Sequence, residues 1–185
     1  MNDLFDHAAG AGAKASSYTA RDIEVLEGLE PVRRRPGMYI GGTDERALHH
    51  LAAEIIDNAM DEAVAGHANR IDIELARDGA LSIADNGRGI PIDPHPKFRG
   101  KSALEVIVTT LHSGGKFSNK AYATAGGLHG VGISVVNALS SYFEVEVARD
   151  KRLYRQRFAK GLAKSKLENL GAVNNRRGTK VTFLP

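Results

Sequence analysis

The hydrophobic pattern changes its period part-way along this chain, and this change constrains the fold more than any other feature. Up to about residue 66 apolar residues recur at helical spacing, whereas beyond residue 142 they alternate with polar residues, as in β-strands. Two short alternating runs, 70–77 and 80–85, lie between these regions and are joined by the hairpin signal Asp78-Gly79. Helices early and antiparallel strands late predict an α+β fold in which a layer of helices covers a single sheet.

Capping residues predict where the helices begin. A first helix is expected from Thr19-x-x-Asp22 to just before Pro36, and a long second helix from a Thr43 cap to a closing Gly66. A third is expected in "SALEVIVTTLHSGG", which opens on the capping-box pattern Ser102-x-x-Glu105, and a fourth after the glycines of "GLHGVGISVVNALSS". The later strands are expected in "FEVEVAR", "RLYRQRF" and "TKVTFLP".

Composition limits the setting of the protein. A length of 185 residues suits one domain, and the absence of cysteine excludes disulfides and thiolate metal sites, which favours a reducing, cytoplasmic location. Residues 1–17 are rich in Ala and Gly and lack the features of a signal peptide, so we expect a flexible arm, and no segment predicts a membrane span. Lys and Arg cluster in "VRRRP", "RDKRLYRQRFAKGLAKSK" and "NNRRGTK", which is compatible with solvated surface or with nucleic-acid contacts.

The long helix carries acidic groups beside its apolar face. At 100° per residue, that face contains Leu48, Leu51, Ala52, Ile55, Ala59 and Ala63. Glu54, Asn58 and Asp61 fall together at its edge, where Glu54 could take a proton from water and the Asn58 oxygen could bind Mg²⁺; an ordinary solvated flank is the alternative. Glu62 lies within the apolar face, so it needs a cationic partner, for which Arg88 is a candidate.

The stretch "DNGRGIP" begins with a carboxylate at the end of an alternating strand. Asp85 shares its face with Leu81 and Ile83, because every second side chain of a strand points to the same side. The pattern therefore directs an acid toward the core.

A second glycine-rich stretch, "GGKFSNKAYATAGGLHGVGIS", precedes a predicted helix. Rows of backbone N–H groups that lead into a helix start can bind anions such as triphosphate. The stretch matches neither the P-loop pattern nor the dinucleotide-binding spacing, so it indicates another kind of phosphate site or a mobile connection.

These three motifs, E-x-x-D-N on a helix, D-N-G-R-G-I-P after a strand and G-G-L-H-G-V-G before a helix, together resemble those of the GHKL ATPases. The stretches "RPGMYIG", "LHSGGKF" and "GGLHGVGISVVNALS" are similar to the ATPase domain of bacterial type II topoisomerase B subunits over residues 18–185. Within that group "GGKFSNKAY" and "GVGIS" resemble the topoisomerase IV subunit more than the gyrase subunit. The resemblance implies a two-layer sandwich, with helices on one face of a mixed, mostly antiparallel sheet, and it implies ATP and Mg²⁺ as ligands.

The resemblance also implies how an adenine base would be held. Asp85 would accept a hydrogen bond from the exocyclic amine, and Arg88 would pair with Glu62 and lie over the base. Thr179 would support Asp85 through a bridging water, and Arg149 would border the pocket. The other residues that the resemblance implies, as close-approach glycines and apolar walls, are Gly87, Gly89, Ile55, Ile90, Pro91, Ile107 and Val181.

For the phosphates, the resemblance implies Glu54 as the general base that activates water and Asn58 as the ligand of Mg²⁺. Lys116 and the segment Gly127, Leu128, His129, Gly130, Val131 and Gly132 would close over the triphosphate. Gyrase subunits usually have a lysine at the position of Ala123, so gyrase-like phosphate contacts are not assumed.

Partners follow from the same resemblance. Tyr18 and Ile23 match residues that the family inserts into a second copy, so ATP binding would close a homodimer, which works with a topoisomerase A subunit as a heterotetramer on duplex DNA. ATP-competitive inhibitors are expected in the adenine pocket. The chain resembles a fragment, so ATP binding is expected with slow or undetectable hydrolysis. The alternatives are a gyrase B subunit, a histidine-kinase catalytic domain and a non-catalytic nucleotide-binding or DNA-binding module.

Overall fold

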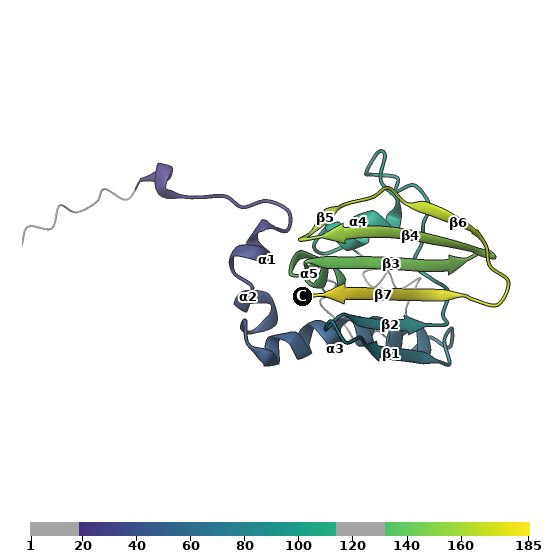
Figure 1. Ribbon diagram of the computed structural model, residues 1–185. Helices are drawn as coiled ribbons and strands as arrows, with labels where there is room; N and C mark the ends of the chain where they lie inside the picture. Colours follow the sequence, from purple (N-terminus) through teal and green to yellow (C-terminus); the bar gives the residue numbers. More distant parts are fainter. Residues whose placement is uncertain (1–18, 114–131) are drawn as a thin grey trace, which may run out of the picture.

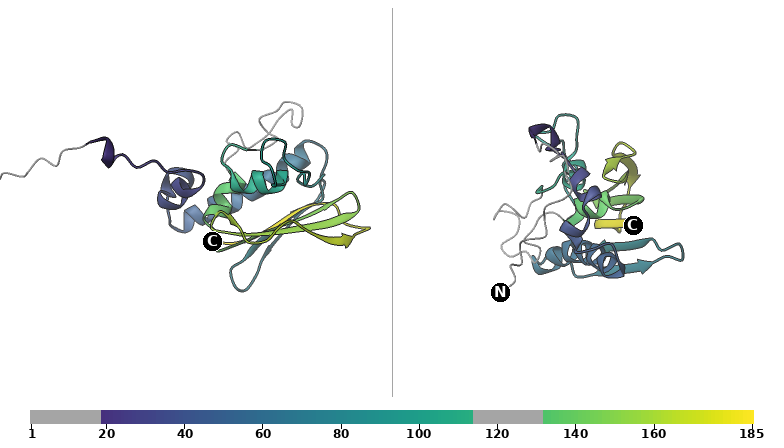
Figure 2. Two further views of the ribbon diagram at one scale, coloured as in Figure 1. Left: turned by 90° about the horizontal axis from the view of Figure 1, so that it is seen from above. Right: turned by 90° about the vertical axis from the view of Figure 1, so that its left-hand side faces the viewer.

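The structure is a computed structural model that describes residues 19–113 and 132–185. Its helices pack on one face of a sheet of seven strands, and the other face of the sheet carries no helix among the described residues (Figures 1 and 2). The strand order is β1-β2-β7-β3-β4-β5, with β6 paired to β4, and all of these pairings are antiparallel. The expected two-layer α+β fold is confirmed, and the sheet is antiparallel rather than mixed over the described residues.

The elements occur in the order helices, hairpin, helices, strands. The helical elements are η1 (Ala20–Asp22), α1 (Glu30–Arg34), α2 (Gly37–Ile40), α3 (Glu45–Val64), α4 (Ala103–Thr109) and α5 (Gly132–Ala138). The strands are β1 (Ile71–Leu75), β2 (Leu81–Asp85), β3 (Tyr142–Arg149), β4 (Arg152–Ala159), β5 (Leu162–Ala163), β6 (Glu168–Ala172) and β7 (Gly178–Leu184). No helix in the described ranges is long and apolar enough to cross a membrane.

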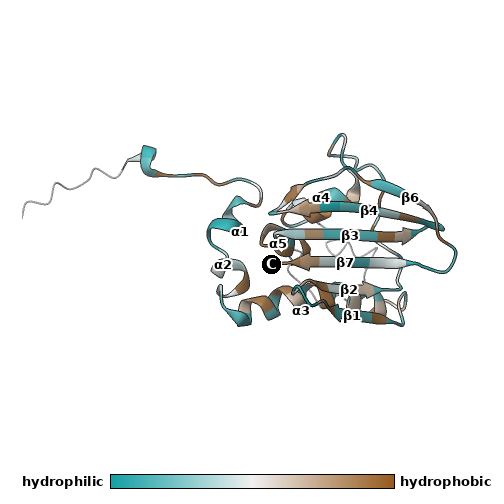
Figure 3. Cartoon of the chain, viewed as in Figure 1, coloured by the Kyte–Doolittle hydropathy of each residue, from teal (hydrophilic) through white to brown (hydrophobic). Residues whose placement is uncertain are grey.

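The core lies between the sheet and the helices. Phe143, Phe158 and Phe183 are almost fully buried on the covered face of the sheet, and the rings of Phe143 and Phe158 meet edge to face with centroids 6.1 Å apart. Leu51 and Ile55 of α3 are buried against them in the same cluster. Apolar and polar segments are interleaved along the central strands (Figure 3), as expected for a sheet with one covered face.

Three expectations about helix ends were wrong. The predicted helix from residue 19 to 35 is interrupted: the capping box of Thr19 and Asp22 closes only the 3₁₀ turn η1, and α1 begins at residue 30. Gly28, which has a φ of 60°, lies between η1 and α1. Ile23 is 58% exposed, so this segment has no buried apolar face that would stabilise a continuous helix. The cap of α3 is Asp44 rather than Thr43, since its side chain accepts a bond from the Ala47 N–H.

The helix expected from Ser102 ends sooner than its sequence suggests. The Ser102 side chain caps α4 by accepting from the Glu105 N–H, as predicted. The backbone becomes extended at Thr110, with φ of −130° and ψ of 129°, before the glycines that were expected to end the helix.

Strand predictions were accurate where apolar and polar residues alternate clearly. Gly79, with φ of 87°, forms the tight turn between β1 and β2, as the Asp78-Gly79 signal predicts. The strands β3, β4 and β7 also lie where alternation predicts them, whereas β5 and β6 were missed because their short segments carry no clear alternation.

The predicted apolar face of α3 is partly confirmed. Leu51, Ile55 and Ala59 are buried, but Leu48 near the start of the helix is 49% exposed. Asp61, which was expected at the edge of the face, is buried.

Candidate functional site

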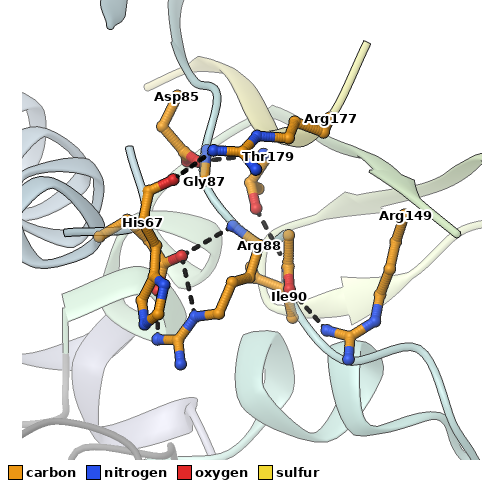
Figure 4. Close-up of polar contacts among 10 residues, drawn as sticks. His67, Asp85, Gly87, Arg88, Ile90, Arg149, Arg177 and Thr179 are labelled. Carbon is orange, nitrogen blue, oxygen red and sulfur yellow. Dashed lines mark hydrogen bonds and ion pairs between the residues drawn. The ribbon is translucent and has the colours of Figure 1, made fainter. Parts of the chain in front are cut away.

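Asp85 ends β2 at the junction of the sheet and the helix layer (Figure 4). Its Oδ1 atom accepts hydrogen bonds from the N–H of Gly87 at 2.7 Å and, at 3.4 Å, from the N–H of Thr179. Burial raises the pKa of Asp85, and the nearby Glu62 carboxylate adds to this, whereas the two N–H groups lower it. The inward-pointing acid expected from the sequence is therefore present. Its partial burial disfavours the charged form of the carboxylate unless hydrogen-bond donors or a ligand compensate.

Glu62 and Arg88 form the ion pair that the sequence indicated. The Arg88 Nη2 atom donates to Glu62 Oε1 at 2.7 Å, while the backbone N–H and Nε of Arg88 donate to Oε2 at 2.8 and 3.2 Å (Figure 4). Because Glu62 belongs to α3 and Arg88 to the turn after β2, this one carboxylate attaches the turn to the helix.

The glycines of the turn are required by packing. A Cβ at Gly87 would lie 2.6 Å from Glu62 Oε2 and 2.8 Å from Asp85 Oδ1. Gly89 has φ of 78°, and a Cβ there would lie 2.9 Å from Val147 Cγ1. The two positions therefore accept no side chain without displacing the acids or the sheet.

Thr179 and Arg149 hold the far side of the turn. The Thr179 hydroxyl accepts a bond from the Ile90 N–H at 3.2 Å, and Arg149 Nη1 donates to the Gly89 carbonyl at 3.0 Å (Figure 4). Thr179 thus contacts Asp85 directly through its backbone, and the bridging water stays a prediction. Of the expected apolar walls, Ile55 and Val181 are buried, Ile90 and Ile107 are half-buried, and Pro91 is exposed.

The residues expected to act on phosphates lie on α3 and at the start of α5. The Asn58 Nδ2 atom donates to the Glu54 carbonyl at 2.8 Å, so the amide oxygen is the atom that would serve as a ligand to Mg²⁺. The Glu54 carboxylate lies against the α-carbon of Gly132, the first residue of α5, where a side chain would collide with it. The structure therefore brings Glu54 to the helix start that follows the second glycine-rich stretch.

Several predicted residues lie outside the described part of the chain. These are Tyr18, Lys116, Gly127, Leu128, His129, Gly130 and Val131. Their roles stay predictions.

One set of contacts at the site was not predicted from the sequence. Arg177 precedes β7 and donates from Nε to the Asn86 carbonyl at 2.7 Å. Its Nη2 atom donates to the His67 carbonyl, also at 2.7 Å (Figure 4). The Asn86 side chain in turn accepts from the N–H groups of Asn69 and Arg70. No local signal marks Arg177, since the run "NNRRGTK" is typical of ordinary basic surface.

This arrangement suits recognition of a neutral ring that carries a hydrogen-bond donor. A partly buried carboxylate stands beside apolar side chains, on a turn whose glycines leave the backbone uncovered. A second acid, Glu54 of α3, lies beside Gly132 at the start of α5. Among the described residues, no group of three or more His, Cys, Asp or Glu side chains could hold a metal alone, so a Mg²⁺ ion there would need ligands from phosphates and water.

A family model described as "Histidine kinase-, DNA gyrase B-, and HSP90-like ATPase" matches residues 43–185, which include all these described site residues. The chain belongs to this ATPase family. The acid, the glycines and the ion pair of the turn after β2 all lie within the matched residues.

Relatives within this ATPase family include topoisomerase subunits. The chain is 68% identical over 170 residues to the B subunit of DNA topoisomerase 4 from Bartonella bacilliformis, covering 92% of this chain and 25% of the relative. It is 55% identical to the B subunit of DNA gyrase from Thermotoga maritima, covering 91% and 26% respectively. The chain thus spans about a quarter of the length of these relatives.

A solved structure supports the fold. The 43K ATPase domain of Thermus thermophilus gyrase B, determined in complex with an aminocoumarin, superposes with a TM-score of 0.74 at 48% identity. The match covers 85% of this chain and 38% of that one.

Proposed function

We propose that this chain is the ATP-binding part of a topoisomerase IV B subunit, in which nucleotide binding closes two subunits around DNA and hydrolysis resets them. The higher identity to the topoisomerase IV relative than to the gyrase relative, 68% against 55%, supports topoisomerase IV over gyrase. Decatenation and relaxation of DNA would then be the activities of the full enzyme, and the cytoplasm its location.

The observation that carries this proposal is the environment of Asp85. An adenine amine donates a hydrogen bond to a carboxylate, whereas guanine has an oxygen at that position and gives the partly buried acid no donor. Burial disfavours the charged form of this acid, so a ligand that donates a hydrogen bond to it should bind with a lower free energy than a ligand that does not. Gly87 and Gly89 let the base lie against the backbone, and Arg88, fixed by Glu62, would cover it.

Glu54 and Asn58 would serve the phosphate end. Glu54 would take the proton of the attacking water, and its place beside Gly132 puts it near the N–H groups that begin α5. Asn58 would hold Mg²⁺ through its amide oxygen, and the ion would neutralise charge on the phosphates. Lys116 is proposed as a further phosphate contact.

The partners of the whole enzyme are part of the proposal. Ile23 and Val25 are 58% and 79% exposed in the segment before α1, which supports a role for this segment in docking on a second copy. An A subunit would cleave the DNA. The Thermus thermophilus domain was solved in complex with an aminocoumarin, which supports binding of small heterocyclic inhibitors here as well, and we propose the adenine pocket as their site.

Titration calorimetry with a non-hydrolysable ATP analogue and its GTP counterpart, both with Mg²⁺, tests the adenine assignment. The wild-type chain is expected to bind the ATP analogue and reject the GTP analogue, and Asp85→Asn is expected to weaken binding by about 10- to 100-fold, the value of a hydrogen bond to a charged group. Asp78→Asn, in the exposed β1–β2 turn, is the matched control and should bind as wild type. Equal binding of both nucleotides, or no effect of Asp85→Asn, would refute the adenine assignment.

The alternatives separate by activity. Slow or undetectable ATP hydrolysis is expected from this chain alone, and Glu54→Gln is expected to abolish hydrolysis in the full-length protein while nucleotide affinity is kept. Assembled with its A subunit, a full-length protein of the proposed kind decatenates DNA, whereas a gyrase introduces negative supercoils. Transfer of phosphate to a protein histidine would instead indicate a histidine kinase. A non-catalytic nucleotide-binding module would bind the ATP analogue but show no Glu54-dependent turnover even in the full-length protein. DNA binding that weakens steeply with salt would reveal a DNA-binding module.

A further inference from the structure

We propose that Arg177 is a positioning residue for base recognition, which acts on Asp85 through the peptide group between Asn86 and Gly87. The inference rests on the proposed function, in which Asp85 reads the base. The hydrogen bonds of the Arg177 side chain go to two backbone carbonyls and not to the Asp85 carboxylate, so its influence on Asp85 is indirect.

The Asn86–Gly87 peptide links the two ends of this interaction. Its carbonyl accepts from Arg177 Nε at 2.7 Å, and its N–H donates to Asp85 Oδ1, also at 2.7 Å. The peptide is planar, so fixing the direction of the carbonyl fixes the direction of the N–H. A cation on the carbonyl also polarises the group and strengthens the N–H as a donor.

The same guanidinium attaches the turn to the segment that follows α3. Arg177 Nη2 donates to the His67 carbonyl at 2.7 Å, and the side chain of Asn86 accepts from Asn69 and Arg70 in that segment, at 2.9 and 3.1 Å. Asn86 is thus held through its carbonyl and its side chain. The turn therefore has little freedom to rotate the Gly87 N–H away from Asp85.

The backbone at the start of β7 places Arg177, the residue before the strand, where it can bond to the carbonyls of Asn86 and His67. Gly178 has φ of 103° and packs so closely on Asp85 and Asn86 that a Cβ there would collide with their backbone. Arg177, the residue before it, consequently lies at the outer edge of the turn, where its side chain crosses to His67 (Figure 4).

The neighbouring arginine provides the matched control. Arg176 Nη2 pairs with Glu146 Oε2 at 2.7 Å, and Glu146 belongs to β3. This pair directs the Arg176 side chain to the sheet rather than to the turn, although Arg176 has the same charge as Arg177 and adjoins it. A general effect of removing positive charge would therefore appear equally in both variants.

The wild type is compared with three variants at a temperature well below their melting transitions: Arg177→Gln, Arg177→Lys and Arg176→Gln. Calorimetry measures the Kd of the non-hydrolysable ATP analogue, and ¹H–¹⁵N NMR follows the Gly87 amide without nucleotide. We expect Arg177→Gln to raise Kd about three- to tenfold, the value of one or two net hydrogen bonds, and to shift the Gly87 amide proton toward the position of a weaker hydrogen bond. Arg177→Lys keeps the charge but reaches fewer acceptors, so intermediate values are expected, and Arg176→Gln should match wild type.

The paired readouts decide the outcome. The inference would be overturned if Arg177→Gln changed the Kd without shifting the Gly87 amide, or shifted the amide without changing the Kd. It would also be overturned if Arg176→Gln raised the Kd as much as Arg177→Gln does. If Arg177→Gln does not fold, Arg177→Lys decides: a folded protein with wild-type Kd and amide position overturns the inference, and one with both changed supports it. Absence of ATP-analogue binding in the wild type would instead refute the proposed function, before any variant is compared.

Discussion

Two glutamate–arginine pairs of nearly equal burial lie on opposite faces of the sheet. Glu62 and Arg88, at the site, have side chains 11% and 39% exposed and a 2.7 Å contact. Glu144 and Arg157, on the face that carries no helix among the described residues, are 15% and 43% exposed with a 2.8 Å contact. Neither distance nor burial distinguishes the pairs.

The pairs differ in what the glutamate holds. Glu62 accepts from the backbone N–H of Arg88 as well as from its side chain, so it fixes the path of a turn that belongs to no strand or helix. Glu144 and Arg157 face each other across β3 and β4, whose backbone is already fixed by the sheet. An ion pair therefore matters most where it supplies order that secondary structure does not.

Gly87→Ala should give the largest effect, because the added methyl group meets both Glu62 and Asp85. We expect a loss of about 3 kcal/mol in the free energy of unfolding and no measurable binding of the ATP analogue. Urea titration and calorimetry measure these quantities. Gly37→Ala, at an exposed glycine that also lacks a positive φ and has room for a Cβ, is the control and should keep nucleotide binding.

Glu62→Gln should come next. Loss of the charge weakens three hydrogen bonds, and because Arg88 is partly exposed we expect about 2 kcal/mol of destabilisation, less than for a fully buried pair. Nucleotide affinity should fall about tenfold. Retention of wild-type affinity in Glu62→Gln would show that the turn keeps its shape without the pair.

A pH series should reveal a smaller, graded effect of Asp85. Its pKa is raised in the folded chain above the value of 3.8 for an unperturbed group, so the folded state binds the proton more tightly than the unfolded state. The resulting stabilisation is full below the unfolded pKa and is lost as the pH rises through the folded pKa. The Tm of wild type minus that of Asp85→Asn should therefore rise as the pH falls from 7 toward 4; a flat or opposite trend would contradict the assigned direction.

Glu144→Gln should give the smallest effect. The sheet holds its backbone without the pair, so we expect a Tm within about 2 °C of wild type and unchanged nucleotide affinity. If this variant loses as much stability or affinity as Glu62→Gln, the contrast between the two pairs is wrong.

Local signals predicted part of this molecule well. The Asp78-Gly79 turn, the Ser102 cap and the place of Glu62 within an apolar helix face depend on neighbours within a few residues or on one helical period. The Glu62–Arg88 pair could be inferred because a buried acid needs a cation and the glycine turn offered one.

Other features depend on contacts that no local pattern encodes. Arg177 meets Asn86 across 91 positions of the chain, and the exposure of Leu48 reflects where other elements cease to cover α3. The early end of the first helix shows the same limit, because the Thr19 capping box specifies one turn while continuation requires a buried face. The acids and glycines of the site and the Glu62–Arg88 pair could therefore be predicted from local patterns, but the other contacts that hold the site in place could not.

The central position of β7 has a consequence for how the protein acquires its shape. β7 follows the other described strands in the chain but lies between β2 and β3, so it joins the β1–β2 hairpin to the remainder of the sheet. Pairing of β2 with β7 closes a loop of nearly a hundred residues, and such distant pairings form slowly. During synthesis, the turn that begins at Asp85 leaves the ribosome long before Gly178 and Thr179 exist to support it. Competence to bind a nucleotide should therefore appear late and abruptly, when the last of these strands docks.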